Sequence, residues 1–199
     1  MSKILTSFPI YSNPEVIKPA IESLNCDKFF VINNPKLAYL AQDYPHIINK
    51  KNNYCNGAWN QAMEYFLQGD WDYLALGSSD VIMGRDWQNK IPTNPKEVFV
   101  PSYVEKLEWL NKPYELKGGV AGACTIFPRE AIKMVYPIPK QLKLWFGDEY
   151  IFTKLRNLGW KIMQAELTAY HYGSLSIMSN PRSMRIIKED KKAWEKLKI

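Results

Sequence analysis

The sequence predicts an α/β protein in which strands and helices alternate along the chain. Short apolar runs bounded by turn-forming residues are typical of buried strands, and longer segments with an apolar stripe at helical spacing lie between them. Such alternation favours right-handed crossovers, a mostly parallel central sheet and helices on both faces of that sheet. With 199 residues, of which 46% are apolar and 23% charged, the chain suits one domain with a substantial core.

The first half of the chain reads as strands that are each followed by a helical segment. Asn13, Pro14 and Glu15 form a typical helix start, with a capping amide, a proline and an acid in the first turn. Because Pro19 interrupts the apolar stripe that follows, we expect the regular helix to begin only there. Asn33-Asn34-Pro35 repeats the same start signal. The strands predicted before the central one are 3–8, 28–32 and 46–49.

The central strand follows the most regular helix pattern in the sequence. An apolar face that includes Ala58, Trp59 and Met63 continues until Gly69, which is placed to end the helix. The next apolar run ends at Ser78-Ser79-Asp80. Because the carboxyl ends of parallel strands face the ligand crevice, we expect Asp80 to lie where a substrate binds.

Beyond Asp80 the alternation is less regular. The Gly-rich stretch 118–127 is costly as a strand unless a ligand or another backbone approaches it closely. We place His171 in the loop after the last predicted strand. The other elements predicted in this half are a strand at 97–100, helices at 128–135 and 148–158, and the last strand at 160–165.

The net charge of +6 is concentrated in the C-terminal segment. Residues 181–199 carry seven basic and three acidic side chains, which leaves a body, residues 1–180, too nearly neutral to suggest a nucleic-acid partner. We expect this segment to form a basic, mildly amphipathic helix. Such a helix is either solvated or in peripheral contact with an anionic membrane.

The cysteines bear on the redox state of the thiols, and the length of the apolar runs bears on where the protein resides. Cys26, Cys55 and Cys124 are odd in number and form no Cys-x-x-Cys pair, so we expect reduced thiols and no zinc site. The sequence contains neither a run of about 18 apolar residues nor a signal-peptide pattern. We therefore expect a cytoplasmic protein.

From about Lys3 to Ser176 the order of these segments resembles the glycosyltransferases of family 2, which have the nucleotide-sugar-binding GT-A fold, a single Rossmann-like domain. No single segment is specific, but the order and spacing together are. The four landmarks are an Asn-rich loop that opens a helix (56–60), a strand ending in an acid (74–80), a Gly-rich strand before a helix (118–129), and an acidic pair that opens a helix ending at glycine (148–159).

The resemblance implies a divalent cation at the end of the central strand. In that family this strand ends in Asp-x-Asp, whose carboxylates hold Mn²⁺ or Mg²⁺ against the diphosphate of the donor. Only Asp80 remains of that motif here, so the implied metal site is weakened, depends on the nucleotide's own phosphates, or is replaced by basic side chains such as Arg182 or Arg185. His171 is implied as a further metal or diphosphate contact. In the alternatives, Asp80 caps the next segment and His171 is structural.

The resemblance also implies the catalytic and donor-binding residues. Asp148 matches the family's catalytic aspartate, with Gly147 in place of the preceding glutamate, and Glu149 is an alternative base. Otherwise the pair only caps a helix. Trp109, Tyr114, Trp145 and Phe146 are candidates for an aromatic acceptor platform. The implied donor contacts are Thr6, Pro9, Asn33, Asn56, Asn60, Ser78, Ser79 and Gly119, of which Asn33 and Asn56 are also good helix caps.

The function that the resemblance implies is transfer of a sugar, with inversion, from a UDP- or GDP-sugar donor to a hydroxyl of a glycan or lipid-linked acceptor. Two alternatives remain open at this point. One is a catalytically inactive GT-A-like module that binds glycan or nucleotide. The other is a sugar nucleotidyltransferase, although residues 8–13 lack the Gly-rich, basic phosphate loop typical of that class.

Overall fold

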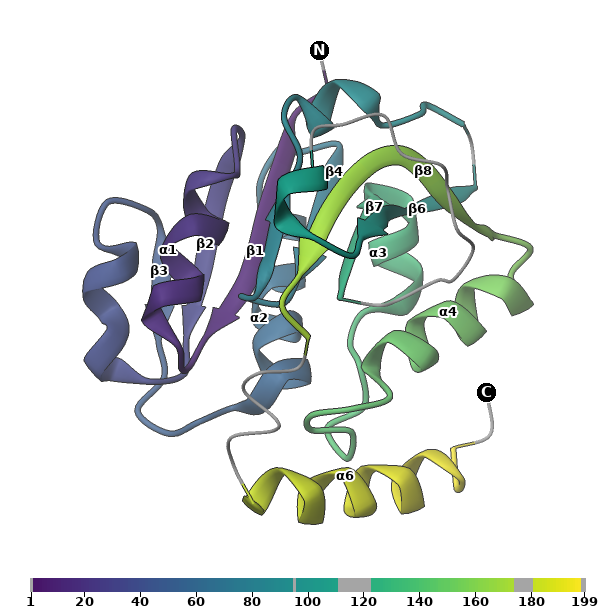
Figure 1. Cartoon of the computed structure of the whole chain (residues 1–199). Coiled ribbons are helices and arrows are strands. Elements are labelled where there is room, and N and C mark those ends of the chain that lie inside the picture. The colour runs from purple at the N-terminus through teal and green to yellow at the C-terminus, as the bar shows by residue number, and fades with distance from the viewer. Residues whose placement is uncertain (1, 95, 111–122, 174–180, 198–199) are drawn as a thin grey trace.

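A computed structural model describes residues 2–94, 96–110, 123–173 and 181–197. One eight-stranded sheet, in the order β3-β2-β1-β4-β7-β6-β8-β5, runs through the molecule, with helices packed on it (Figure 1). The strands are β1 (Ile4–Ile10), β2 (Asp27–Ile32), β3 (His46–Ile48), β4 (Tyr73–Gly77), β5 (Val81–Met83), β6 (Glu97–Val104), β7 (Cys124–Pro128) and β8 (Lys161–His171).

The predicted α/β architecture is confirmed, and the larger parallel part of the sheet comes from the first half of the chain. Strands β3, β2, β1 and β4 are parallel neighbours, and β6 is parallel to β8. Three pairings are antiparallel: β7 with β4, β7 with β6, and β5 with β8. The less regular alternation beyond Asp80 corresponds to this mixed part of the sheet.

Helices cover both faces of the sheet. On one face, α2, α3 and α4 pack against the sheet, and on the other face lie α1 and two 3₁₀ helices. Helix α6 lies along one end of the molecule (Figure 1). The helices are α1 (Pro14–Glu22), α2 (Tyr54–Gln68), α3 (Arg129–Val135), α4 (Gly147–Asn157) and α6 (Pro181–Trp194), with 3₁₀ helices at Pro35–Ala41, Trp87–Lys90 and Leu107–Trp109.

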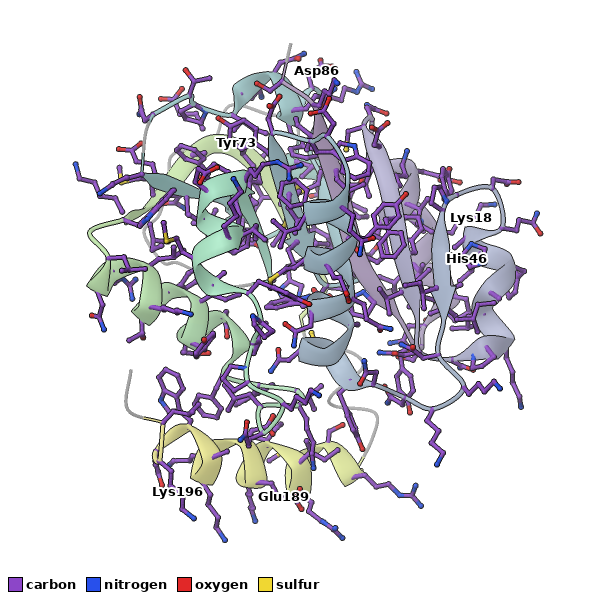
Figure 2. All side chains as sticks on the ribbon, turned by 180° about the vertical axis from the view of Figure 1, so that it is seen from behind. Lys18, His46, Tyr73, Asp86, Glu189 and Lys196 are labelled. Atoms are coloured by element: carbon purple, nitrogen blue, oxygen red, sulfur yellow. The ribbon has the colours of Figure 1, made fainter. Side chains whose placement is uncertain are left out.

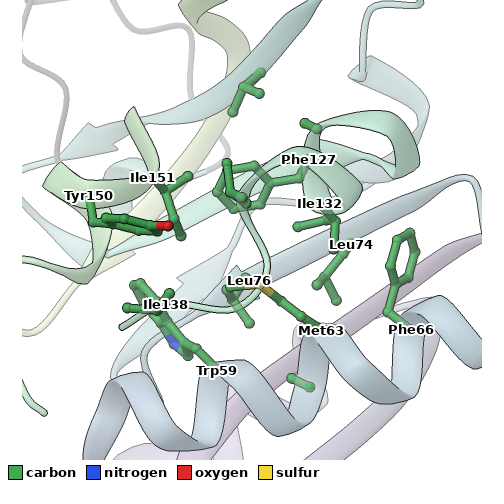
Figure 3. Packing of buried hydrophobic residues seen from close by; sticks show 14 of the residues in the cluster. Trp59, Met63, Phe66, Leu74, Leu76, Phe127, Ile132, Ile138, Tyr150 and Ile151 are labelled. Atoms are coloured by element: carbon green, nitrogen blue, oxygen red, sulfur yellow. The ribbon is translucent and has the colours of Figure 1, made fainter. Parts of the chain in front are cut away.

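The alternation of side chains along the strands builds a core on each face. In β2, Phe29 faces the α2 side and Phe30 faces the α1 side, and both are almost fully buried. Figure 3 shows Trp59 and Met63 of α2 directed toward Leu76 of β4. The two cores enclose the sheet from both faces, and the carboxyl ends of its strands carry the site described below.

Three elements differ from the sequence prediction. Helix α1 begins at Pro14 and continues through Pro19, because burial of its apolar face offsets the lost backbone hydrogen bond. Strand β5 was not predicted. Strand β8 continues to His171 because both β6 and β5 pair with it, so the prediction of a loop at His171 is wrong.

In the described ranges, no helix is long and apolar enough to cross a membrane.

Candidate active site

A pocket of about 420 Å³ lies at the carboxyl ends of β1, β2 and β4. The strand ends contribute Pro9, Asn33 and Ser78, while α2, α4 and α6 supply further walls. The predicted site residues that line this pocket are Pro9, Asn33, Asn56, Ser78, Ser79, Asp80, Asp148, Glu149 and His171.

Asp80 and His171 are brought together by the pairing of β5 with β8. Val81 lies opposite His171 in this ladder, and the backbone N–H of Tyr172 donates to the carbonyl of Asp80 at 3.0 Å. His171 Nε2 lies 3.3 Å from Asp80 Oδ1, and the Ser78 hydroxyl donates to the same oxygen. Burial favours the neutral acid, but the hydrogen bonds from His171 and Ser78 and the charge of His171 hold the pKa of Asp80 below its ordinary value.

The donor set fits a divalent cation only in part. Within the described ranges, no group of three or more His, Cys, Asp or Glu side chains is placed to hold a metal ion. Asp80 and His171 offer one carboxylate and one imidazole at the pocket. Mg²⁺ in particular is often held by one or two carboxylates together with substrate phosphates and water, so a nucleotide's phosphates would have to complete the coordination.

The acidic pair lies in the first turn of α4. Phe146, whose φ of 61° is left-handed, occupies the N-cap position, and the backbone N–H of Glu149 donates to Asp148 Oδ1 at 3.1 Å. Partial desolvation of the Glu149 carboxyl, followed by the hydrogen bond and negative charge of Asp148, raises the pKa of Glu149 to about 7. A carboxyl with such a pKa can accept and release a proton near neutral pH.

Cys55 also lines the pocket, and its side chain is a neutral thiol. Burial, together with the negative charges of Asp148 and Asp80, raises the pKa of Cys55 to about 12. The thiolate is the nucleophilic form of cysteine, so this side chain is not an activated nucleophile. Cys26, Cys55 and Cys124 are all free thiols.

The asparagines near the pocket are occupied by contacts within the protein. Asn33 donates through Nδ2 to the carbonyl of Tyr54 at 2.9 Å, and its Oδ1 accepts from the Asn49 side chain at 2.9 Å. Neither Asn33 nor Asn56 is a helix cap, because the caps are Asn34 and Asn53. These side chains therefore shape the loop at the pocket as well as lining it.

Two predicted donor contacts, Thr6 and Asn60, do not line the pocket. Thr6 is buried in β1, with Oγ1 at 2.9 Å from the Sγ of Cys26. Asn60 lies one turn beyond Asn56 on α2 and makes two hydrogen bonds with the backbone of Ile138. Gly119, Tyr114 and the side chain of Trp109 lie outside the described part of the structure.

Several lining residues were not identified from the sequence. Trp145 and Phe146, two of the four residues predicted as an acceptor platform, do line the pocket, whereas the exposed Arg182 and Arg185 do not. No Lys or Arg lines the pocket in the described ranges. The lining residues that were missed include Tyr11, Asn52, Tyr54, Trp59, Leu144, Ser183 and Ile186. In the sequence these residues fit an ordinary apolar pattern or an ordinary polar segment, so none of them indicated a site.

The sheet order, with the pocket at the strand ends and an acid after the central strand, defines the GT-A-like fold. Among solved structures, the chain is similar to S. aureus TarS, with 12% identity over 98% of this chain and 44% of that chain, at a TM-score of 0.62. TarS residues 1–349 have also been solved in complex with UDP-GlcNAc, with a TM-score of 0.62 over 99% of this chain and 68% of that one.

Two other similar structures belong to different enzymes. The T. maritima inositol-1-phosphate CTP transferase is 9% identical over 96% of this chain and 97% of that chain, at a TM-score of 0.59. The catalytic domain of Drosophila beta1,4galactosyltransferase 7, in complex with xylobiose, is 15% identical over 83% and 66%, at 0.51. No protein family model and no curated protein matches the chain. At these identities the likeness establishes the fold alone.

Proposed function

We propose that this chain is a glycosyltransferase that moves a sugar from a UDP- or GDP-sugar to a hydroxyl of a glycan or lipid-linked acceptor, with inversion. The observation that carries the proposal is the collection, in one pocket, of an ionised Asp80 beside His171 and an acidic pair that includes a carboxyl of pKa about 7. Solved structures of the same fold with UDP-GlcNAc and with xylobiose support the kind of donor and acceptor.

In this proposal Asp80 has a different chemical task from the acidic pair. Asp80 and His171 would hold a divalent cation, which would stabilise the negative charge that develops on the departing diphosphate. Within the described residues, no Lys or Arg lines the pocket to supply that stabilisation instead.

The acidic pair supplies the general base in this proposal. Glu149 removes the proton of the acceptor hydroxyl as the hydroxyl oxygen attacks the anomeric carbon, and partial desolvation together with Asp148 keeps the pKa of Glu149 high. The bond from the anomeric carbon to the phosphate oxygen breaks on the opposite side of that carbon, so the anomeric configuration inverts. Trp145 and Phe146 give the acceptor an aromatic surface for stacking.

A second candidate function is nucleotidyl transfer. It is favoured by the T. maritima structure, whose chain matches this one over nearly the full length of both. Such an enzyme consumes a nucleoside triphosphate and a sugar phosphate and releases pyrophosphate, whereas a glycosyltransferase releases a nucleoside diphosphate.

Product analysis separates these candidates. The chain is incubated with a panel of UDP- and GDP-sugars, glycan and lipid-linked acceptors, and Mn²⁺, and released UDP or GDP is measured. Release that is lost in Asp80→Asn and in Glu149→Gln is the expected result. Release of pyrophosphate from a triphosphate and a sugar phosphate would instead identify a nucleotidyltransferase. Nucleotide or glycan binding without any turnover would indicate an inactive binding module.

A further inference from the structure

Asp190 of α6 is a fully buried carboxylate, although it lies in the most basic segment of the chain. Its two oxygens accept three backbone hydrogen bonds from successive residues of the loop before α4. The N–H groups of Lys143, Leu144 and Trp145 donate to it at 3.0, 2.7 and 2.8 Å. Burial of a carboxylate without such donors would strongly destabilise the fold. The three charge-assisted hydrogen bonds offset this cost and fix the carboxylate against the loop.

The same loop is held from its other side by α2. Asn56 Nδ2 donates to the carbonyl of Trp145 at 3.0 Å, and the backbone N–H of Asn56 donates to the carbonyl of Lys143 at 3.0 Å. Trp145 is therefore fixed at its N–H by Asp190 and at its carbonyl by Asn56. Phe146, Gly147 and the acidic pair of α4 follow immediately along the chain.

Other contacts place α6 against this loop over much of its length. The ring of Trp194 stacks on that of Phe146, with centroids 5.9 Å apart and planes 15° apart. Ser183 and Ile186, near the start of α6, line the pocket itself. The exposed Glu189 and Lys196 mark the outer side of the helix in Figure 2. The helix thus forms a wall of the pocket as well as part of the molecular surface.

We propose that Asp190 is a positioning residue for the acidic pair Asp148–Glu149 and that α6 is an integral wall of the active site. The inference rests on the proposed function, because only that function gives the pair its role as base. The carboxylate fixes the path of residues 143–145, and this path sets where α4 begins. A shift of about 1 Å in a catalytic group can reduce turnover about 100-fold.

The decisive variant is Asp190→Asn, which keeps the shape of the side chain. Its amide nitrogen presents hydrogen atoms where N–H donors converge, so at least one of the three hydrogen bonds is lost. Ile187→Ala is the matched control, because it removes a buried side chain of the same helix and leaves the carboxylate in place. Glu195→Gln changes an exposed carboxylate just beyond the last turn of α6.

The first measurement is hydrogen exchange of the backbone amides of residues 143–149, which requires no enzymatic activity. In Asp190→Asn we expect these amides to exchange at least about tenfold faster while those of α2 remain protected. The control Ile187→Ala is expected to lower the melting temperature without this local change. Unchanged protection at 143–149 in Asp190→Asn would overturn the inference, whatever the protein catalyses.

The second measurement is the turnover number and KM for the donor and acceptor. In Asp190→Asn we expect turnover to fall about 10- to 100-fold, with KM for the donor nearly unchanged, because Asp80 is not displaced. Both controls should retain turnover. If Ile187→Ala had the same melting temperature as Asp190→Asn and lost as much turnover, Asp190 would contribute to stability alone. That result would refute the proposal. Local opening in a protein that transfers no sugar would instead refute only the proposed function.

Discussion

At the scale of single residues, two carboxyl groups of the pocket have pKa values that are shifted in opposite directions. Hydrogen bonds from His171 and Ser78 keep the pKa of Asp80 low, so Asp80 is ionised at neutral pH. Partial desolvation and the charge of Asp148 raise the pKa of Glu149 to about 7. Environments that separate two carboxyl groups in this way are typical of sites where one group binds charge and the other transfers a proton.

This difference predicts the pH dependence of turnover. Because a general base must be deprotonated, turnover should rise with pH and level off above about pH 7. In Asp148→Asn the negative charge that favours protonated Glu149 is lost, so the pKa of Glu149 falls and the midpoint of the curve moves to lower pH. Turnover numbers measured between pH 5 and 9 test this. If Asp148 itself were the base, the variant would lose turnover at every pH.

A second residue-scale prediction concerns Gly147, which is the first residue of α4 and precedes the acidic pair. A Cβ at this position would overlap the side-chain oxygen of Asn56. We expect Gly147→Ala to lower the free energy of unfolding by about 1 to 3 kcal/mol, the usual cost of overpacking. Denaturant unfolding measures this loss.

The double variant Gly147→Ala/Asn56→Ala tests the cause of that loss. Removing the Asn56 side chain relieves the overlap, so the double variant should be more stable than the sum of the two single effects predicts. Simple additivity would show that the cost of Gly147→Ala does not come from Asn56.

At the scale of elements, local patterns predict helices and buried strands well and pairing poorly. The apolar face of α2 and Gly69 after it identify that helix from sequence alone. Strand β5 has only three residues, and its partner β8 lies about 90 residues further along the chain, so no local pattern reveals it. That pairing is what brings His171 to Asp80, which explains why the sequence predicted both residues but misplaced His171.

The side of an element that faces the pocket was equally hard to predict. Asn56 and Asn60 are one helical turn apart, yet only Asn56 lines the pocket, because Asn60 bonds to the backbone of Ile138. Thr6 points toward Cys26 within the sheet rather than toward the strand end. Which side chains face the pocket depends on contacts between distant segments, and these contacts cannot be inferred from one sequence.

The junction of α2 with α3 yields an element-scale prediction. The guanidinium of Arg129 donates to the carbonyl of Phe66, in the last turn of α2, at 3.2 Å, and to those of Gly69 and Trp71, just beyond the helix, at 2.8 Å. It therefore caps the end of α2. We expect Arg129→Ala to lower the free energy of unfolding by about 1.5 to 3 kcal/mol. Denaturant unfolding with Lys161→Ala, an exposed cation, as control measures this; equal effects would contradict a capping role.

At the scale of the whole molecule, the pocket depends on segments from both ends of the chain. Pro9 comes from β1, while Ser183 and Ile186 come from α6. In the sequence, Asp190 is one acid in a basic segment and reads as a solvated charge. Only the folded chain reveals that three N–H groups of a distant loop converge on it. The sequence could therefore predict the GT-A fold and most of the strand-end residues, but not the wall that α6 forms.

The last prediction follows from the charge of the residues that line the pocket. Asp80, Asp148 and Glu149 line it together, and in the described ranges no Lys or Arg does. A nucleoside diphosphate should therefore bind well only with a divalent cation. We expect UDP or GDP with Mn²⁺, at about 100 times the dissociation constant, to raise the melting temperature by about 5 to 10 °C. Thermal unfolding should show little shift with nucleotide alone, with excess EDTA, or in Asp80→Asn, whereas the exposed-site control Asp43→Asn should behave as wild type. An equal shift in EDTA would show that the cation is not needed.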